Sequence, residues 1–458
     1  MQDADAATGS YPWFINRGEG MGRQALLLIH GIGEQRPMDT LRGFAREVWS
    51  KDTSVHRPGP GAEAIWSKPY PLSEDFELRR LTTGENKSGQ RTDFFEFYWA
   101  HLMKGTELKH VLAWLATLLL RLPGRVPPQL RPAYWVLWTL VLLSGGLALG
   151  YCLLKSQGDG FWTFSVSVPA WLSLAVSIVL LPVIAFLARQ IVGDAARYLH
   201  VAAANVQMRH SIRSAGLRVL KDLHARGYDR IVVVGHSLGT VIAYDILSYA
   251  WSEWNAEKTS PGGVDQALDD MEALTVRAAG GEDVAAEVFH DAQRACLRES
   301  IANGHTWRVS DFVTLGSPLA HAPLLLARDQ KALSAKFQER EYAQCPPVLE
   351  VRRSKGQDVH SFRYFDKKLS RKVLHHAALF AVTRWTNLYF PCRALLWGDL
   401  VGGPVAGVFG AGVRDVPVRT RRRFGLCSHT FYWRAALRGD DHIDKLREAV
   451  NVLDQPRA

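Results

Sequence analysis

One stretch decides the fold: Ile231-Val-Val-Val-Gly-His-Ser-Leu-Gly239, which continues as Thr240–Tyr249. The four β-branched residues predict a short buried strand, and the apolar spacing from Thr240 onward predicts a helix. Between them lies the pattern G-x-S-x-G, with Gly235, His236, Ser237, Leu238 and Gly239 in order. This is the form of a nucleophile elbow, in which a sharp strand-to-helix turn pushes a serine out of the sheet. The pattern predicts that Ser237 is the nucleophile of a serine hydrolase.

Composition describes a folded chain. The 458 residues are 47% apolar and 22% charged, enough for one large domain with insertions or for two domains. The net charge of +10 favours an acidic partner, but no nucleic-acid-binding module is recognisable, and an anionic membrane attracts the same lysines and arginines. We therefore expect no nucleic acid. The polar N-terminus lacks the apolar core of a secretory signal, so export is not expected.

The cysteines indicate neither a disulfide framework nor a zinc site. They are five in number, widely spaced and without a C-x-x-C pair: Cys152, Cys296, Cys345, Cys392 and Cys427. No metal ligand set is predicted, and the chemistry expected at the elbow needs no cofactor.

Strand and helix patterns alternate along the chain. Helices are predicted at Asp39–Trp49 and Asp194–Arg226, and further strands at Ala25–Ile29, Phe76–Thr83, Arg91–Trp99, Val309–Leu315, Thr383–Phe390 and Val413–Val418. Such alternation predicts an α/β fold with a mostly parallel sheet, helices on both faces and a site at the carboxyl ends of the strands. Residues 252–306 are interpreted as a helical cap over the site. Residues 328–376 form a basic insertion, either a solvated surface or one that contacts lipid headgroups.

Two uncharged stretches, 133–154 and 161–188, are each long enough to span a bilayer, and they predict a transmembrane hairpin. A pair of buried core helices is the alternative. Lysines and arginines flank the hairpin on both sides, which predicts a multi-pass protein whose catalytic domain faces the cytoplasm. The alanine- and arginine-rich composition favours a bacterial source, and therefore a bacterial inner membrane. A helix in the membrane interface is predicted at Val111–Leu120. The domains are then 1–103, a membrane insertion at 104–193, and 194–458.

A serine nucleophile needs a histidine base, and the elbow fold orders the triad as serine, acid, histidine. Sixteen histidines are available. His429 follows the last predicted strand, as the order requires, and is preferred. His442 lies at the start of a predicted terminal helix and is the alternative. His30 precedes the nucleophile and is interpreted as an organiser of its loop.

For the acid, Asp399 lies between the last two predicted strands and is preferred. Asp415 lies within a strand and would have to point along it, and Asp311 precedes the carboxyl end of its own strand. The oxyanion hole needs two backbone N–H groups. Leu238 supplies one, and the loop after the first strand supplies the other, through Ile32 or else Gly31.

Six motifs together resemble one family: Ile29-His-Gly-Ile-Gly33, Val234–Asp245, Thr314-Leu-Gly-Ser-Pro318, Trp385-Thr-Asn-Leu-Tyr389, Asp399-Leu-Val-Gly-Gly403 and His429-Thr-Phe-Tyr-Trp433. They are similar to the lipase-like branch of the α/β-hydrolase superfamily, which includes bacterial lipases and GPI inositol-deacylase-like proteins. The resemblance covers the sheet and the elbow. It implies ester hydrolysis through an acyl-enzyme, carried by Ser237, Asp399 and His429. The stretch between Tyr389 and Asp399 departs from the family by being longer and more apolar.

We therefore expect a membrane-anchored serine esterase or lipase whose partners are the lipid bilayer and a lipid or acylated ester. The expectation of a lipid rests only on the predicted membrane location. Two alternatives remain open: a membrane-tethered scaffold that has lost activity, and an acyltransferase that uses the same triad. No pattern in the sequence specifies the oligomeric state or the acyl chain length.

Overall fold

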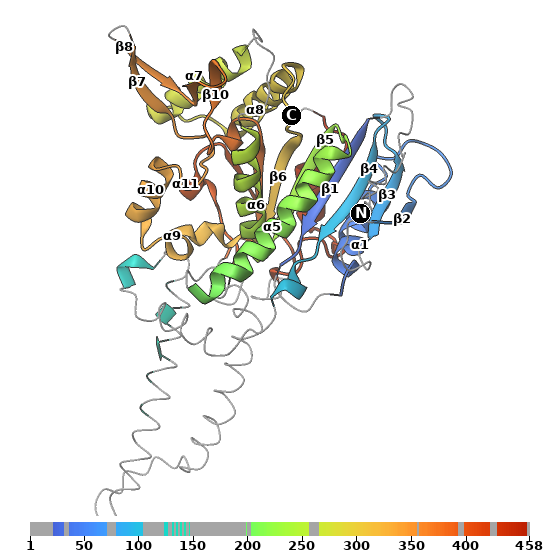
Figure 1. Ribbon diagram of the computed structural model, residues 1–458. Coiled ribbons are helices and arrows are strands. Elements are labelled where there is room, and N and C mark those ends of the chain that lie inside the picture. The colour runs from blue at the N-terminus through green and yellow to red at the C-terminus, as the bar shows by residue number, and fades with distance from the viewer. Residues whose placement is uncertain are drawn as a thin grey trace, which may run out of the picture.

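The computed structural model describes residues 22–31, 36–70, 79–103, 123–126, 203–255, 265–354, 357–392, 398–421 and 428–455, with single positions between 131 and 198. Its centre is an eight-stranded sheet in the order β12-β11-β6-β5-β1-β4-β3-β2 (Figure 1). Six strands are parallel: β1 (Arg23–Ile29), β4 (Arg91–Phe97), β5 (Arg230–His236), β6 (Val309–Leu315), β11 (Arg384–Tyr389) and β12 (Val413–Pro417). At one edge, β3 (Arg79–Glu85) and β2 (Ile65–Pro69) are antiparallel.

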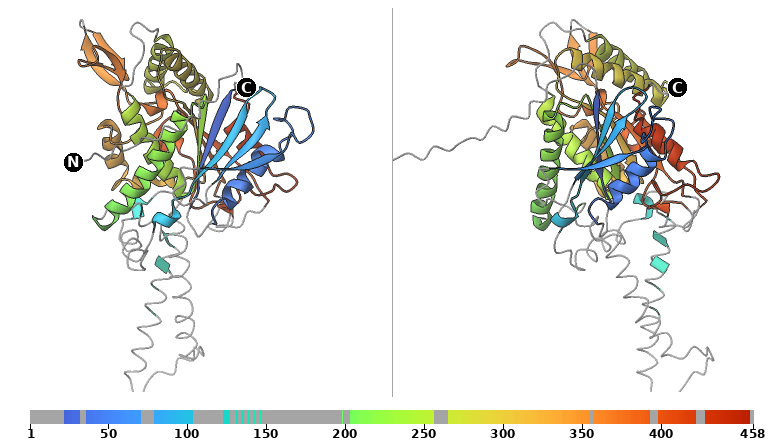
Figure 2. Two further views of the ribbon diagram at one scale, coloured as in Figure 1. Left: turned by 45° about the vertical axis from the view of Figure 1, so that its right-hand side comes forward. Right: turned by 90° about the vertical axis from the view of Figure 1, so that its right-hand side faces the viewer.

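Helices cover both faces of the sheet, as Figure 2 shows in its edge-on view. On one face lie α5 (Ala203–Ala225) and α6 (Leu238–Trp254). On the other lie α1 (Asp39–Ala45), its π-helical continuation η1 (Arg46–Ser50), and α13 (His442–Val450). Side chains alternate between the faces of a strand, so β1 contributes to two cores. Leu27 and Ile29 pack on the side of α6, and Leu26 and Leu28 pack on the side of α1.

The segment expected to cap the site lies elsewhere. It forms α7 (Gln266–Ala279) and α8 (Ala286–Ala302), which pack against each other. His290 of α8 hydrogen-bonds the carbonyl of Trp385 at the start of β11, and Glu287 pairs with Arg414 at the start of β12. These are the amino ends of the strands, whereas Ser237 follows the carboxyl end of β5. The amphipathic pattern of a helix shows that one side is buried, but not at which end of the sheet.

The basic insertion forms α10 (Gln330–Gln338) and two hairpins outside the main sheet. One pairs β7 (Glu350–Ser354) with β8 (Gln357–Ser361), and the other pairs β9 (Arg363–Asp366) with β10 (Arg371–Leu374). Arg363 joins them to α7, because its guanidinium pairs with Glu272 at 2.8 Å and also with Asp265 and Asp269. The remaining short helices are η2 (Ala100–Leu102), η3 (Pro123–Arg125), η5 (Pro318–His321), α9 (Ala322–Leu325), η6 (Leu379–Ala381) and α11 (Ala406–Phe409).

The prediction of a transmembrane hairpin is contradicted. Within the described ranges, no helix combines the length and the apolar character needed to cross a bilayer. The predictions of a multi-pass protein, an inner-membrane location and a cytoplasm-facing catalytic domain are corrected with it. Most of 133–154, all of 161–188 and the helix predicted at 111–120 lie outside the described residues. The prediction was based on the length and hydropathy of the two uncharged stretches. These two properties do not by themselves establish that a spanning helix forms. The fold that the described residues support is a mixed α/β fold with a mostly parallel sheet.

Candidate active site

Ser237 occupies a strained turn between β5 and α6. Its backbone has φ 53° and ψ −129°, a region that a residue with a Cβ rarely adopts. Hydrogen bonds hold it there on both sides. Its N–H donates to the carbonyl of Leu315 at 2.9 Å, and its own carbonyl accepts from the N–H and hydroxyl of Thr240 at 3.0 and 2.7 Å. The surrounding strand and helix thus determine the conformation of the serine.

Gly239 allows the first turn of α6 to lie directly on the end of β1. A Cβ at this position would lie 2.2 Å from the carbonyl oxygen of Ile29 and 2.4 Å from that of His30. Because both neighbours are backbone atoms, neither can move aside as a side chain would. Only glycine fits here, which explains the last residue of the G-x-S-x-G pattern.

The structure brings Ser237, His429 and Asp399 into one chain of hydrogen bonds. The Ser237 hydroxyl lies 2.7 Å from Nε2 of His429, and Nδ1 of the same ring lies 2.9 Å from Oδ2 of Asp399. With the proton on Nδ1, the imidazole donates to the carboxylate and accepts from the hydroxyl, which is the arrangement that lets a histidine act as a base. Ser237 is 5% exposed and Asp399 is 1% exposed, so water is largely excluded from these contacts.

Asp399 is held as a carboxylate. Its Oδ1 accepts from the amides of Val401 and Gly402 at 2.9 and 3.0 Å, and its Oδ2 accepts from the Tyr432 hydroxyl at 2.9 Å as well as from His429. Burial alone would raise the pKa of Asp399, but His429 and these donors outweigh burial and lower that pKa to about 2. Asp399 is therefore charged throughout the neutral range.

The other two candidate acids have structural partners. Asp415 accepts from the amide of Asn387 at 2.7 Å and from the backbone N–H groups that begin α11. Asp311 lies in the amino half of β6 and accepts from Arg230 at 2.6 Å and Arg384 at 2.8 Å. Both carboxylates are used to satisfy buried donors instead.

The other two candidate histidines also lie outside the triad. His442 contacts the carbonyl of Arg434 at 2.9 Å, at the start of α13. His30 stacks on Trp99 with ring centroids 5.1 Å apart, and its carbonyl accepts from the indole N–H of that tryptophan at 2.9 Å. Burial lowers the pKa of His30 to about 4, so it is neutral. His30 organises the end of β1.

Two residues that complete the site could not be assigned a role from the sequence. His236, predicted only as part of the elbow, lies 2.8 Å from the carbonyl of His429 through Nε2. Burial lowers its pKa to about 3, so the ring is neutral, and Nε2–H is the donor to that carbonyl. The second residue is Tyr432, which contacts Asp399. Its one available signal was its place three residues after the base, which is too common a spacing to interpret.

One oxyanion donor can be placed. Leu238 begins α6, so its N–H has no acceptor within the helix, and it lies at the positive end of the helix dipole. The second predicted donor, Ile32, lies outside the described residues. Gly31 is described, and a Cβ on it would lie 2.7 Å from Cβ of Ser237. The loop after β1 therefore passes directly against the nucleophile, where the second donor was predicted.

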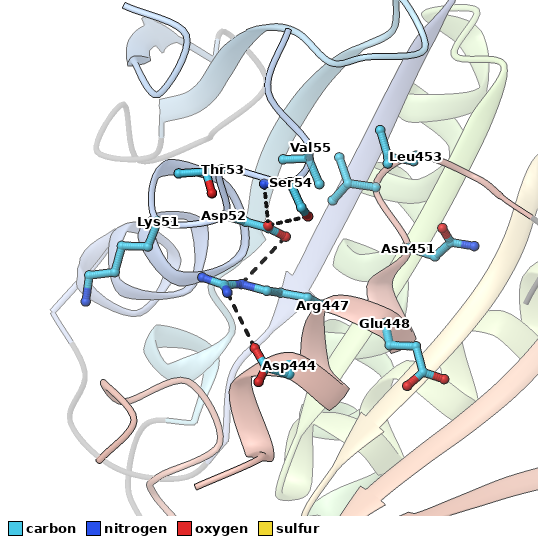
Figure 3. Close-up of a pocket in the computed structure, with 11 residues that line it drawn as sticks. Lys51, Asp52, Thr53, Ser54, Val55, Asp444, Arg447, Glu448, Asn451 and Leu453 are labelled. Atoms are coloured by element: carbon cyan, nitrogen blue, oxygen red, sulfur yellow. Dashed lines mark hydrogen bonds and ion pairs between the residues drawn. The ribbon is translucent and has the colours of Figure 1, made fainter. Parts of the chain in front are cut away.

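A groove of about 490 Å³ lies away from the triad, between the residues that follow η1 and helix α13 (Figure 3). Its charges are paired within the protein: Arg447 lies 3.6 Å from both Asp52 and Asp444, and Glu448 lies 2.7 Å from Arg414. Neither a nucleophile with a base nor an uncompensated charge is evident among its lining residues. Within the described ranges, no group of three histidine, cysteine or acidic residues is arranged to hold a metal ion.

The chain matches no protein-family model, no curated protein and no solved structure. The resemblance to lipase-like α/β-hydrolases therefore remains a prediction from the motifs. Any proposal about function depends on the geometry around Ser237.

Proposed function

We propose that this protein is a serine hydrolase that cleaves a carboxylic ester through an acyl-enzyme. The observation that supports the proposal is the hydrogen-bonded chain from Ser237 through His429 to Asp399, built on a strained elbow. The motif resemblance to lipase-like hydrolases favours an ester over an amide. The expectation of a lipid substrate depended on the membrane anchor and is dropped with it.

In the first half of the reaction, the oxygen of Ser237 attacks the ester carbonyl carbon while Nε2 of His429 takes the hydroxyl proton. The carbonyl oxygen becomes an oxyanion beside the N–H of Leu238. The tetrahedral intermediate then collapses, the bond to the leaving alkoxide breaks, and His429 returns the proton to that oxygen. The products are an acyl-enzyme on Ser237 and a free alcohol.

In the second half, water attacks the acyl carbon and gives one proton to Nε2 of His429. Collapse breaks the bond to the Ser237 oxygen, which takes that proton back, and the carboxylic acid leaves. Asp399 stabilises the imidazolium formed in both halves without itself becoming protonated. Because the carboxylate is buried, its interaction with the imidazolium is only weakly screened by solvent.

A fluorophosphonate probe tests the proposal, since it reacts with an activated serine and requires no knowledge of the natural substrate. We expect the wild-type protein to be labelled and Ser237→Ala to be unlabelled. Ser334→Ala is the matched control, because Ser334 is exposed on α10 and bonds only to the backbone of its own helix. It should be labelled like the wild type. An unlabelled wild-type protein would indicate an inactive scaffold and overturn the proposal.

A panel of p-nitrophenyl esters of increasing acyl length then measures turnover in the same three proteins. Release of nitrophenol together with free acid supports hydrolysis. If nitrophenol is released only when an acceptor alcohol is added, and the acyl group appears on that alcohol, the protein is an acyltransferase. Turnover that persists in Ser237→Ala would show that another group performs the reaction.

A further inference from the structure

We infer that Tyr432 is a positioning residue that limits the basicity of His429 by sharing one oxygen of the Asp399 carboxylate with it. The inference rests on the proposed function, because it concerns the base of that reaction. Its basis is that two donors meet at a single acceptor. Oδ2 of Asp399 lies 2.9 Å from Nδ1 of His429 and 2.9 Å from the hydroxyl oxygen of Tyr432.

The other carboxylate oxygen does not relieve this competition. Oδ1 of Asp399 accepts from the amides of Val401 and Gly402, which belong to the same loop. The carboxylate is thus oriented by its own loop, with Oδ2 directed at the base. A change in the hydrogen bond from Tyr432 to Oδ2 therefore changes the interaction of Oδ2 with His429.

The Tyr432 hydroxyl is held as a donor. A phenol has one hydrogen and can also accept, and here the N–H of Phe390 donates to its oxygen at 3.2 Å. The hydroxyl hydrogen is therefore left for Asp399. Burial and the neighbouring carboxylate raise the pKa of Tyr432 well above its ordinary value, so the hydrogen stays in place across the working range.

Packing holds the ring of Tyr432 in place. Its side chain is 1% exposed and packs on Phe390 with ring centroids 4.7 Å apart. The cluster is also closed from β6, where a Cβ on Gly316 would lie 2.7 Å from the Tyr432 ring and 2.8 Å from Oδ2 of Asp399. The backbone at Gly316 therefore packs closely against both Tyr432 and Asp399.

Among the described residues, the other titratable groups near the pair do not supply charge at neutral pH. They are His236 at the end of β5, His30 at the end of β1 and His321 on η5. Burial lowers the pKa of each, to about 3 for His236 and about 4 for His30, and all three are neutral. Asp399, on the loop between β11 and β12, is the charged partner of His429.

The direction in which the Tyr432 hydroxyl shifts the pH dependence of the reaction follows from the charges involved. A hydroxyl that donates to Oδ2 spreads part of the carboxylate charge and so weakens its hold on a protonated imidazole. Without that hydroxyl, protonated His429 is stabilised. Since only neutral His429 can take the serine proton, the reaction then requires a higher pH. A residue that merely filled space would change the maximal rate or the folded fraction, but not this midpoint.

The test is the rate of fluorophosphonate labelling between pH 4 and 9, on the full chain. In Tyr432→Phe, the midpoint of the acid limb should move upward by about 0.5 to 1 unit, which lowers labelling on that limb by about three- to tenfold relative to the plateau. Tyr244→Phe is the matched control, because this buried hydroxyl donates to the carbonyl of Ala343 away from the triad. Its midpoint should equal that of the wild type.

A second variant covers the case in which Tyr432→Phe fails to fold. Replacing Tyr432 with 3-fluorotyrosine keeps the shape and makes the hydroxyl a stronger donor, so the midpoint should move downward. An unchanged midpoint in the folded variant overturns the inference, as does an equal shift in Tyr244→Phe. A wild-type protein that is not labelled at any pH removes the proposed function and this inference together, whereas normal labelling with unmoved midpoints removes the inference alone.

Discussion

Nε2 of His236 donates a hydrogen bond to the backbone carbonyl of His429, with 2.8 Å between nitrogen and oxygen. One side chain thereby joins the residue directly before the nucleophile to the backbone of the base. The same ring makes an edge contact with Trp433, with centroids 4.7 Å apart. The distance between nucleophile and base therefore depends on a contact outside the triad itself.

His236→Leu should slow fluorophosphonate labelling by about tenfold, the effect of losing roughly one hydrogen bond that aligns the base. His236→Gln retains an N–H donor of similar reach and should stay within about threefold of the wild type. The rates are compared at equal folded fraction, measured by circular dichroism. A leucine variant that reacts at the wild-type rate would show that the contact has no part in alignment.

Asp399→Asn should reduce labelling by about 10³-fold or more while leaving the protein folded. The amides of Val401 and Gly402 select the oxygen of the new side chain, so its NH₂ group faces His429. Nδ1 must then accept, the proton moves to Nε2, and the ring can no longer take a proton from the serine. Asp415→Asn is the control, since it alters a buried carboxylate that binds only structural donors. Its folded fraction should keep normal reactivity.

Gly239→Ala should destabilise the protein by about 3 kcal/mol or more, because the new Cβ would overlap two carbonyl oxygens of the chain at the end of β1. Gly84→Ala places the same methyl group where no atom lies within 4 Å, and should change stability by less than about 1 kcal/mol. Urea unfolding of both variants measures the difference. Equal stability of the two variants would mean that the elbow does not pack on β1 as described.

Ionisation of Glu96 on β4 should lower the free energy of unfolding as the pH rises. Its carboxylate accepts from the amide of Met38 at 2.8 Å, but burial raises its pKa to about 7 from an ordinary value of 4.5. A raised carboxyl pKa means that the folded state retains a proton that the unfolded chain has released. Stability is therefore lost between about pH 4.5 and 7, by roughly 3 kcal/mol in all.

Glu96→Gln keeps an acceptor for Met38 and removes the titration. The variant should match the wild type near pH 4.5 and exceed its free energy of unfolding at pH 8. Glu339→Gln, at an exposed position after α10, is the control and should follow the wild-type profile. Parallel pH profiles for the wild type and Glu96→Gln would rule out the buried carboxyl as the cause.

The sheet and the elbow could be predicted because local pattern determines them. Val309–Leu315 forms β6 with the expected bounds, since a buried parallel strand has a continuous apolar character. The choice of Asp399 followed from chain order. By contrast, β7 and β8 were not predicted, because the alternation is weak there and Val351 and Val359 are 60% and 46% exposed.

Contacts between residues that lie far apart in the chain could not be predicted from the sequence. His236 and His429 are 193 positions apart, and nothing in either motif indicates that one ring holds the other's carbonyl. Residues 252–306 were predicted to be a cap, and nothing in that segment indicates that its acidic residues Asp265 and Glu272 bind Arg363, about ninety residues later. The membrane prediction was wrong for a related reason. The hydropathy of a stretch shows that its side chains are apolar, but it does not determine what surrounds them.

The separation of 192 positions between Ser237 and His429 also has a consequence during synthesis. At 5–20 residues per second, the ribosome makes the serine about 10–40 s before it makes the base. During that interval the hydroxyl lacks its general base, even if the strand and helix around it have already formed. The proposed reaction therefore requires that the segment around His429 has already packed onto the elbow. The order of synthesis thus delays assembly of the proposed triad until the last part of the chain has been made.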